Sequence, residues 1–335
     1  MEFMIYIIVI KILGENMANK TLRNANKEKE DEFYTQLSDV EKELKYYREY
    51  FKDKVIFCNC DDPADSSFWK YFELNFTVLG LKKLVATHYE TQKPSYKLEI
   101  IKDENGDGII TSKDIITTPL KQNGDFRSPE CIEILKEADI VITNPPFSLF
   151  REYVAQLVEY KKDFIIIGNT NALTYKEIFK LIKDDKIRTG YTNFNVGMYF
   201  FVPDSYEKYH KIVDNRKMVR VSTSCWFTSL PVTKHKDNII LYKNYNDEEY
   251  PKYDNYDAIN VNKVNEIPCD YNGLMGVPIT FLDKYNPEQF TVVDALNRYA
   301  LLDIQGTNEQ VQKAHSHTCN INGKPTYFRV VIEKK

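Results

Sequence analysis

The sequence predicts an α/β protein with a parallel sheet covered by helices on both faces, plus a smaller, irregular β-rich region at the C-terminal end. Short apolar strands alternate with helical patterns between about residues 37 and 183, and this alternation is typical of parallel sheets that are buried on both sides. After about residue 230, Tyr, Asn, Asp and Pro become frequent and helical patterns become rare. We therefore expect an α/β domain at residues 18–231 and a second region at residues 232–335.

The elements of the α/β domain follow from the hydrophobic pattern, taken in chain order. A polar lead-in at 18–32 precedes a helical pattern at 37–51. Apolar runs predict strands at 54–60, 82–90, 139–143 and 163–169, and helical patterns fill the intervals at 66–76, 128–138, 147–160 and 174–183. In a sheet of this kind, ligands bind beyond the carboxyl ends of the strands.

The N-terminal residues 1–17 read as a non-native or disordered extension. Residues 1–16 are an apolar run interrupted by Lys11. The run is too short to span a bilayer, and it lacks the basic leader and cleavage site of a signal peptide. We interpret it as the product of an upstream start codon, with the working protein beginning near Met17. A peripheral membrane anchor is the alternative.

Composition excludes several classes of protein. The net charge of the 335-residue chain is -4, so a nucleic-acid partner needs a local basic patch. The six cysteines are scattered and form no CxxC pair, which argues against a disulfide scaffold and a zinc ribbon. We expect reduced thiols in a cytoplasmic protein.

The motif that decides the functional reading follows the strand at 139–143. The chain continues with Asn144, Pro145, Pro146 and Phe147. Proline cannot donate to a strand ladder, and it restricts its own backbone and that of the residue before it. The motif therefore predicts a rigid loop at a strand end, and a stiff turn without function is the alternative.

These residue types suit methylation of the exocyclic amine of adenine, whose lone pair is delocalised into the ring. The side-chain oxygen of Asn144 and a backbone carbonyl fixed by proline can accept hydrogen bonds from the two amine hydrogens and orient the nitrogen toward a methyl donor. The ring of Phe147 can stack on the base. We therefore assign residues 144–147 as catalytic.

Other segments fit a binding site for the methyl donor S-adenosylmethionine. In methyltransferases that use this donor, an Asp-Phe pair one helix before the motif strand holds the donor's adenine, and Asp125 and Phe126 occupy that place. An ordinary Asn-Gly turn is the alternative. Tyr34 and Thr35 precede the first strand, where such enzymes place a hydroxyl-bearing loop near the donor's methionine end. Glu90 ends the second strand, where an acid binds the donor's ribose.

The sequence resembles the adenine-specific DNA methyltransferases of the EcoRI methylase type over about residues 24–290. The resemblance rests on the segments at 58–87, 123–157, 164–179, 253–261 and 276–290. It implies a Rossmann-like methyltransferase sheet, S-adenosylmethionine as methyl donor, double-stranded DNA as substrate and a target base that is flipped out of the duplex. It also implies a restriction-modification or orphan methylation system, so a restriction nuclease of the same specificity is a possible partner.

One departure concerns the loop after the first strand. The wider superfamily has a Gly-rich donor-binding loop there, whereas this chain has Asp61, Asp62 and Pro63 with no glycine. The resemblance implies donor contacts at these residues, and Asn144 lies near the donor as well.

A basic segment at residues 205–243 holds eight Lys and Arg against three acids. A solvated face is the alternative to phosphate contacts. The residues that we assign to DNA binding are Lys208, Lys211, Arg216, Lys217, Arg220, Lys234 and Lys236.

Two metal-like patterns are discounted. Residues 103–114 match a calcium loop through Asp103, Asn105, Asp107, Gly108 and Asp114, but the alternating flank predicts a β-hairpin. His315, His317 and Cys319 share a face of a possible strand without a fourth ligand. We expect no metal site.

Three functions stay open on these observations. The first is site-specific methylation of DNA adenine, in which the C-terminal region reads the sequence. The second keeps the chemistry but acts on RNA or on a protein glutamine. The third is a non-catalytic DNA-binding relative, against which the intact motif argues.

Overall fold

The computed structural model describes residues 33–90, 95–296 and 319–335. Its contacts form two compact units, Met1–Ala172 with Gly190–Leu230 and Leu173–Thr189 with Pro231–Lys335. The expected domain boundary stays a prediction, although one change of unit falls beside it. The expectations for residues 1–17, His315 and His317 lie outside the described residues. Among the described helices, none has both the length and the apolar character needed to cross a membrane.

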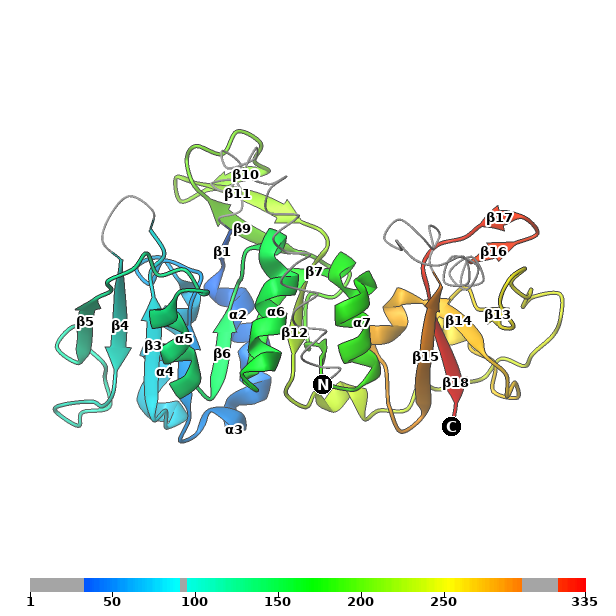
Figure 1. Cartoon of the computed structure of the whole chain (residues 1–335), viewed down its shortest axis with the longest axis horizontal. Coiled ribbons are helices and arrows are strands. Elements are labelled where there is room, and N and C mark those ends of the chain that lie inside the picture. Colours follow the sequence, from blue (N-terminus) through cyan, green and yellow to red (C-terminus); the bar gives the residue numbers. More distant parts are fainter. Residues whose placement is uncertain (1–32, 91–94, 297–318) are drawn as a thin grey trace. The chain divides into compact units, whose positions relative to one another are not determined.

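The first unit contains a mixed sheet with strand order β5-β4-β3-β2-β6-β7-β12 (Figure 1). Its centre is parallel and consists of β3 (Lys83–Thr87), β2 (Val55–Cys58), β6 (Ile140–Thr143) and β7 (Asp163–Asn169). The edges are antiparallel, through β4 (Tyr96–Ile100) and β5 (Ile115–Pro119) on one side and β12 (Ser224–Thr228) on the other. The expected parallel sheet is thus correct for the centre and wrong for the edges.

Helices connect the parallel strands. They are α4 (Ser67–Leu79) between β2 and β3, α5 (Pro129–Glu137) before β6, and α6 (Phe150–Glu159) between β6 and β7. Right-handed crossovers run in opposite directions on the two sides of β2, so α4 covers one face and α5 and α6 cover the other. The N-terminal helices α2 (Leu37–Leu44) and α3 (Arg48–Phe51) pack against α4. Phe57, Val141 and Ile166 are fully buried between these layers.

The same unit has a small antiparallel sheet with strand order β1-β9-β11-β10. Its strands are β1 (Tyr34–Thr35), β9 (Met198–Val202), β11 (Arg216–Val221) and β10 (Lys211–Val213). These strands were not predicted from the sequence, because β1 and β10 are only two and three residues long and β9 and β11 are partly exposed. Through β1, the first described residues are tied to β9.

The hairpin expected around residues 103–114 is confirmed, since β4 pairs antiparallel with β5. Its connection spans residues 101–114, which is longer than a two-residue turn. Asp103 accepts hydrogen bonds from the backbone N–H groups of Gly106 and Gly108, and Asp114 accepts from Glu104 and Thr111. These carboxylates therefore fold the loop, and the described residues contain no cluster of three or more metal-ligating side chains.

The second unit is β-rich, as expected. Its sheet has the order β13-β14-β18-β15 and comprises β13 (Ile259–Asn260), β14 (Met275–Pro278), β18 (Arg329–Lys334) and β15 (Phe290–Leu296). The second unit also contains the hairpin of β16 (Asn320–Ile321) and β17 (Lys324–Pro325) and the two-residue strand β8 (Arg188–Thr189). Helix α7 (Lys176–Lys183) packs on β15, where Lys183 Nζ donates to Val293 O at 2.6 Å.

Candidate active site

The candidate site lies where β2 and β6 end side by side. These strands are parallel neighbours, and β2 is flanked by β3 on its other side. The chain connections therefore diverge at β2, and such a switch point is where open α/β sheets bind ligands. The loop after β2 holds Asp61 and Asp62, and the loop after β6 holds Asn144 and Phe147. The fold thus brings two of the predicted segments to one edge.

A buried polar contact joins the two strand ends. The hydroxyl of Thr143 donates to the carbonyl of Asn59, and the hydroxyl of Tyr153 on α6 donates to the side-chain oxygen of Asn59. All three side chains are almost fully buried. Hydrogen bonds between buried partners fix geometry, because breaking one leaves an unpaired polar group. The loops after β2 and β6 are therefore held in register.

The amide of Asn144 donates a hydrogen bond through its nitrogen, whereas its oxygen accepts none from the described residues. It is 6% exposed, and its Nδ2 donates to the backbone carbonyl of Phe33 at 2.6 Å. Its Oδ1 is shielded from solvent and has no hydrogen-bond partner among the described residues. A buried unpaired acceptor costs about 1–3 kcal/mol. The contact with Phe33 therefore presents an acceptor that is ready for a ligand donor.

The two prolines shape the loop that follows Asn144. Pro145 is buried, and Pro146 has φ −54° and ψ 126°. The carbonyl of Pro146 accepts from Leu149 N at 3.0 Å, which closes the short 3-10 helix Phe147–Leu149. The rigid loop that the sequence predicts therefore exists, and it leads directly into α6.

Phe147 belongs to an aromatic cluster with Phe33, Phe200 and Tyr206. The rings of Phe147 and Phe33 are stacked, with centroids 5.6 Å apart and planes at 22°. Phe200 meets both rings edge-on, and Tyr206 meets Phe33 edge-on. Sequence analysis missed Phe33, because its contacts with residues 144 and 147 cross more than a hundred positions of the chain.

Tyr34 and Thr35 reach the site through β1. Thr35 pairs with Phe200 in the small sheet and is 2% exposed. Its hydroxyl oxygen is buried without a hydrogen-bond partner in the described residues. Because Thr35 lies two residues after Phe33, which contacts Asn144, this second unpaired polar atom belongs to the same site.

Asp61 is a buried acid at the end of β2. Its Oδ2 accepts from the hydroxyl of Ser66 at 3.2 Å, and Ser66 also caps α4 by accepting from Trp69 N. Burial raises the pKa of Asp61 to about 8, because the Ser66 hydrogen bond offsets only part of the desolvation and the charge of Asp62 adds to it. Carboxyl groups with a strongly raised pKa cluster at functional sites of proteins.

Asp62 and Pro63 continue the loop. Asp62 Oδ1 accepts from Ala64 N at 2.9 Å and from the hydroxyl of Tyr96 at 3.1 Å. Its Oδ2 lies 3.5 Å from Nε2 of His88. Pro63 is buried. Asp62 thus ties the β2 loop to the residues that follow β3.

His88 is a second residue that sequence analysis missed. It follows β3, its ring stacks on Tyr96 with centroids 4.9 Å apart, and its Nδ1 is buried without a partner in the described part of the chain. The sequence predicted a strand at 82–90 that contains His88 and ends at Glu90, whereas β3 ends at Thr87, so both residues lie beyond the strand. Glu90 lies two residues further on, and its backbone N–H donates to the carbonyl of Asn123 at 3.0 Å.

Gly124 allows the segment before Asp125 to approach the end of β3. It has φ +78°, and a Cβ atom there would lie 1.8 Å from the carbonyl oxygen of His88. Only glycine combines this backbone conformation with so close an approach. The predicted donor segments after β3 and before α5 are therefore neighbours.

Asp125 and Phe126 are both engaged within the chain. Arg127 donates to both carboxylate oxygens of Asp125, at 2.8 and 2.6 Å. Burial acts to raise the pKa of Asp125, but the hydrogen bonds from Arg127 outweigh it and leave the pKa below its usual value. Phe126 is 6% exposed and meets Tyr153 edge-on. A ligand amine at Asp125 would share this carboxylate with Arg127 or replace it.

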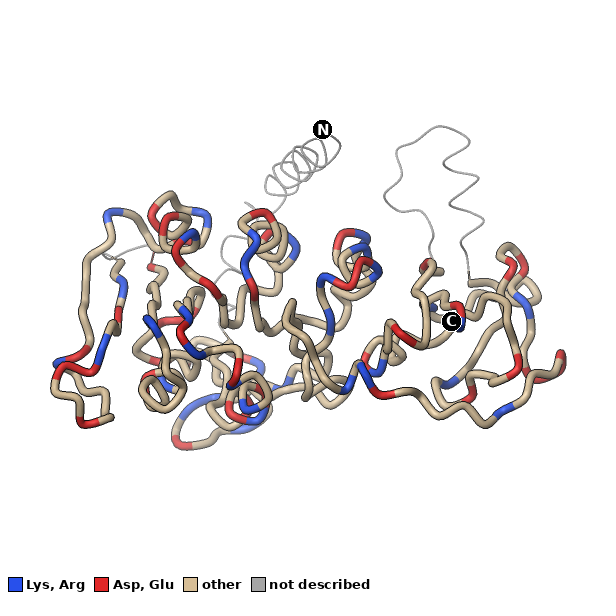
Figure 2. The backbone as a smooth tube through the Cα atoms, turned by 90° about the horizontal axis from the view of Figure 1, so that it is seen from below, with Lys and Arg blue, Asp and Glu red and all other residues tan. Residues whose placement is uncertain are grey.

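The cations assigned to DNA binding divide between the units. The small sheet carries Lys211, Arg216, Lys217 and Arg220, and Lys208 lies in the connection between β9 and β10, whereas Lys234 and Lys236 lie in the second unit. Figure 2 shows basic and acidic residues interspersed along the rest of the chain. The basic segment is therefore divided between the two units.

The outer face of the small sheet combines cations with aromatic rings. Lys211 lies 4.8 Å from the ring centroid of Tyr199, and Arg216 lies 4.5 Å from that of Phe201. Arg220 donates to Val196 O at 2.9 Å. Lys217 donates to two carbonyls, those of Asp204 and Tyr206. Of these four cations, Lys217 thus donates the most hydrogen bonds.

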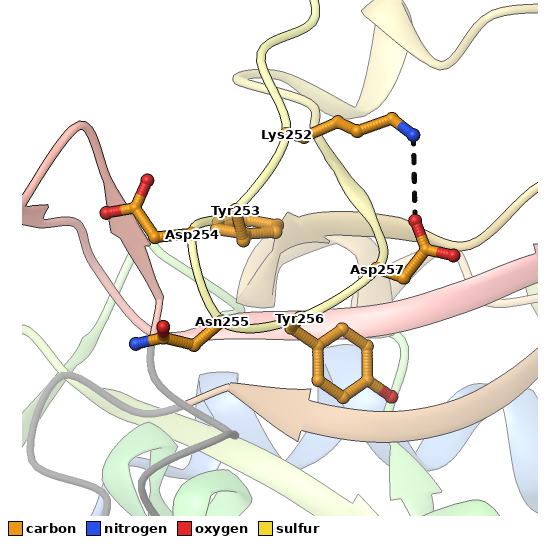
Figure 3. Close-up of a pocket in the computed structure, with 6 residues that line it drawn as sticks. All are labelled: Lys252, Tyr253, Asp254, Asn255, Tyr256 and Asp257. Atoms are coloured by element: carbon orange, nitrogen blue, oxygen red, sulfur yellow. Dashed lines mark ion pairs between the residues drawn. The ribbon is translucent and has the colours of Figure 1, made fainter.

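The second unit has a hollow of about 470 Å³ lined by residues 252–257 (Figure 3). Lys252 Nζ lies 3.6 Å from Asp257 Oδ1 across it. The carboxylate of Asp254 accepts from the backbone N–H groups of Asn322 and Gly323. The acids of the hollow are thus engaged in contacts within the chain. None of the residues 252–257 has a buried side-chain atom without a hydrogen-bond partner, in contrast to the candidate site.

Comparison with known proteins gives one consistent result. The family model described as adenine-specific methyltransferase EcoRI matches residues 21–335. The chain is 48% identical to the Type II methyltransferase M.EcoRI of Escherichia coli, over 96% of this chain and 99% of that protein. It is 42% identical to M.MpnI of Mycoplasma pneumoniae, over 93% and 97%, and 41% identical to M.MgeORF184P of Mycoplasma genitalium, over 93% and 98%. No solved structure matches the chain.

Proposed function

Because the chain belongs to the family of EcoRI adenine-specific methyltransferases, we propose that it transfers a methyl group from S-adenosylmethionine to the N6 amine of an adenine in double-stranded DNA. The amide of Asn144 is the observation that carries this proposal. Its nitrogen donates to the carbonyl of Phe33, and its oxygen is buried without a hydrogen-bond partner among the described residues. An amine is the donor that such an acceptor suits, and a rigid loop places it beside an aromatic ring that can stack on a base.

The residues around the strand ends fit S-adenosylmethionine. Thr35 Oγ1 and His88 Nδ1 are buried polar atoms without partners in the described residues, and Asp61 is a buried carboxyl with a single hydroxyl donor. We expect these groups, with Tyr34, Asp62, Pro63, Glu90, Asp125 and Phe126, to hold the donor. When bound, the donor supplies a methyl group activated by its positive sulfur. The parallel centre of the sheet then serves as a Rossmann-like scaffold.

The chain's own residues prepare the amine for attack. Asn144 Oδ1 accepts one amine hydrogen, and a proline-fixed backbone carbonyl of the loop accepts the other, so that the nitrogen lone pair is localised and directed. Phe147 stacks on the base and tolerates the positive charge that develops on it. The amine is inaccessible while the base is paired, so the adenine must be flipped out of the duplex.

DNA is held outside this pocket. We assign phosphate contacts to the exposed cations of the small sheet and base reading to the second unit, in which we place no residue of the methyl-transfer site. The relatives compared above are named Type II methyltransferases, and we therefore place this enzyme in a restriction-modification system, where a nuclease recognises the same site.

Methylation mapping tests the proposal. The chain is expressed in a host that lacks adenine methylation, and modified adenines are mapped across the genome. We expect one recognition sequence to be methylated nearly everywhere it occurs, and none in cells that express Asn144→Ala. In vitro, RNA and a glutamine-containing protein should compete poorly with duplex DNA for methyl transfer. A folded wild-type protein that leaves every adenine unmodified contradicts the proposal.

A further inference from the structure

The ring of Phe33 covers one face of Phe147, the ring on which the proposed function stacks the base. The two rings are stacked at 5.6 Å, and each contacts Phe200, which is fully buried. Phe33 is placed by β1, whose Tyr34 and Thr35 pair with β9. A ring from the start of the chain thus occupies the surface on which a flipped base would stack.

A base cannot be inserted between these two rings as they stand. Aromatic carbons approach each other to about 3.5–4.0 Å, so a planar base held between two rings needs them about 7 Å or more apart. The observed centroid separation is 5.6 Å. Either Phe33 leaves Phe147 when the base arrives, or the small sheet moves away from the motif.

We propose that Phe33 is a positioning residue that imitates the target base in the DNA-free enzyme and that the flipped adenine displaces its ring. This inference rests on the proposed function, since it requires a base at Phe147. The backbone carbonyl of Phe33 stays bound to Asn144 and keeps Oδ1 directed at the amine. The ring of Phe33 competes with the base. A flipped base must therefore stack better than a phenyl ring, which favours a purine over a pyrimidine.

The carbonyl and the ring can be separated experimentally, because only the ring depends on the side chain. Phe33→Ala removes the ring and keeps the carbonyl, and Phe33→Tyr keeps both. Tyr50→Ala is a matched control, since Tyr50 is a half-exposed aromatic on α3 outside the cluster. The substrate is a duplex with 2-aminopurine at the target position found by methylation mapping, because its fluorescence rises when the base is unstacked from the duplex.

Removing the competing ring should strengthen binding of the flipped base. An aromatic pair contributes about 0.5–1.5 kcal/mol, so we expect Phe33→Ala to lower Kd for this duplex roughly two- to tenfold, with higher fluorescence. Phe33→Tyr and Tyr50→Ala should match the wild type.

Weaker or unchanged binding by Phe33→Ala overturns the inference, since weaker binding means that Phe33 forms a second wall of the base pocket. If Phe33→Ala lowers the melting temperature so far that the protein does not fold, Phe33→Leu replaces it, and the same gain in affinity is required. Wild-type activity separates the two levels of the argument. If the wild type methylates no adenine, the proposed function fails, whereas a failure confined to the Phe33 variants leaves it intact.

Discussion

The buried carboxyl of Asp61 predicts a pH-dependent stability. Its folded pKa of about 8 lies above the ordinary 3.8, so folding favours the protonated form. The stability that this contributes is fully present below about pH 4, and it is lost as pH rises toward and through about 8. In Asp61→Asn that pH-dependent contribution is absent. The melting temperature of the wild type should therefore fall more than that of Asp61→Asn between about pH 5.5 and about pH 8.5.

Thermal unfolding of both proteins without donor, at matched ionic strength, measures this difference. Glu133→Gln is a control, because Glu133 is an exposed acid paired with Lys136 on α5. Parallel curves for the wild type and Asp61→Asn would show that Asp61 ionises normally.

Asn144 predicts a loss of turnover with little loss of stability. In Asn144→Ala the amine keeps one acceptor and loses the preorganised one, which typically costs about a hundred- to a thousandfold in rate. Asn144→Asp should also be slow, because a carboxylate cannot donate to the Phe33 carbonyl and is repelled by it. The measurement is single-turnover methyl transfer, with donor and DNA affinities determined separately.

Asn75→Ala is the matched control, since the amide of Asn75 also donates to a backbone carbonyl, that of Tyr71 at 2.7 Å, but on α4. A near wild-type rate in Asn144→Ala would show that Asn144 only shapes the turn and has no role in methyl transfer.

The sequence predicted individual site residues where local chemistry is distinctive. Asn144 and Phe147 form an unusual tetrapeptide with the prolines, and Asp61 directly follows an apolar strand. Phe33 and His88 have no such local signature. Their roles depend on contacts with residues distant in sequence, such as Phe147 and Tyr96, and a pattern along the chain does not report these. The assigned roles in donor binding stay predictions.

The small sheet predicts a particular salt dependence of DNA binding. Replacing Arg216, Lys217 and Arg220 by Gln should weaken binding to all DNA sequences and flatten its dependence on salt, because each phosphate contact releases about one counterion. Lys217 should contribute least, since it already donates to two carbonyls.

Binding titrations over a range of salt concentrations, with cognate and unrelated duplexes, measure this. Lys136→Gln is a control cation, because Lys136 is paired with Glu133 at 2.6 Å on α5. A loss confined to the cognate duplex, at an unchanged salt slope, would mean that these residues read bases.

Strands could be predicted more reliably than their direction. The apolar runs in the sequence predict buried strands at β2, β3, β6 and β7, and the structure contains all four. Hydrophobic periodicity does not distinguish a parallel from an antiparallel neighbour, so the antiparallel pairing of β4 with β3 and of β12 with β7 was not predicted. The small sheet was missed because its strands β1 and β10 are only two and three residues long.

The division into units predicts where the chain can be cut. A chain that ends at Leu230 keeps α7 but loses β15 and β18. Ile178 and Ile182 of α7 are 1% and 4% exposed, and the ring of Phe179 meets Phe328 edge-on. The truncated chain would expose this apolar face, so we expect it to aggregate.

A matched chain that also has residues 173–189 replaced by a Gly-Ser linker should be more soluble. Soluble yield and size-exclusion chromatography compare the two. Equal solubility of the two chains would show that the apolar face of α7 is buried without the second unit. The boundary expected near residue 231 would then be sufficient to obtain a soluble first domain.

The contact between Asn144 and Phe33 also has a consequence for the timing of synthesis. The two residues are separated by 111 positions, and β1 stays unpaired until β9 has been made. At about 5–20 residues per second, a ribosome needs on the order of ten seconds or more to travel that far. The acceptor amide therefore acquires its orientation only when most of the first unit has emerged. We therefore expect nascent fragments that carry the motif but end before β9 to be inactive.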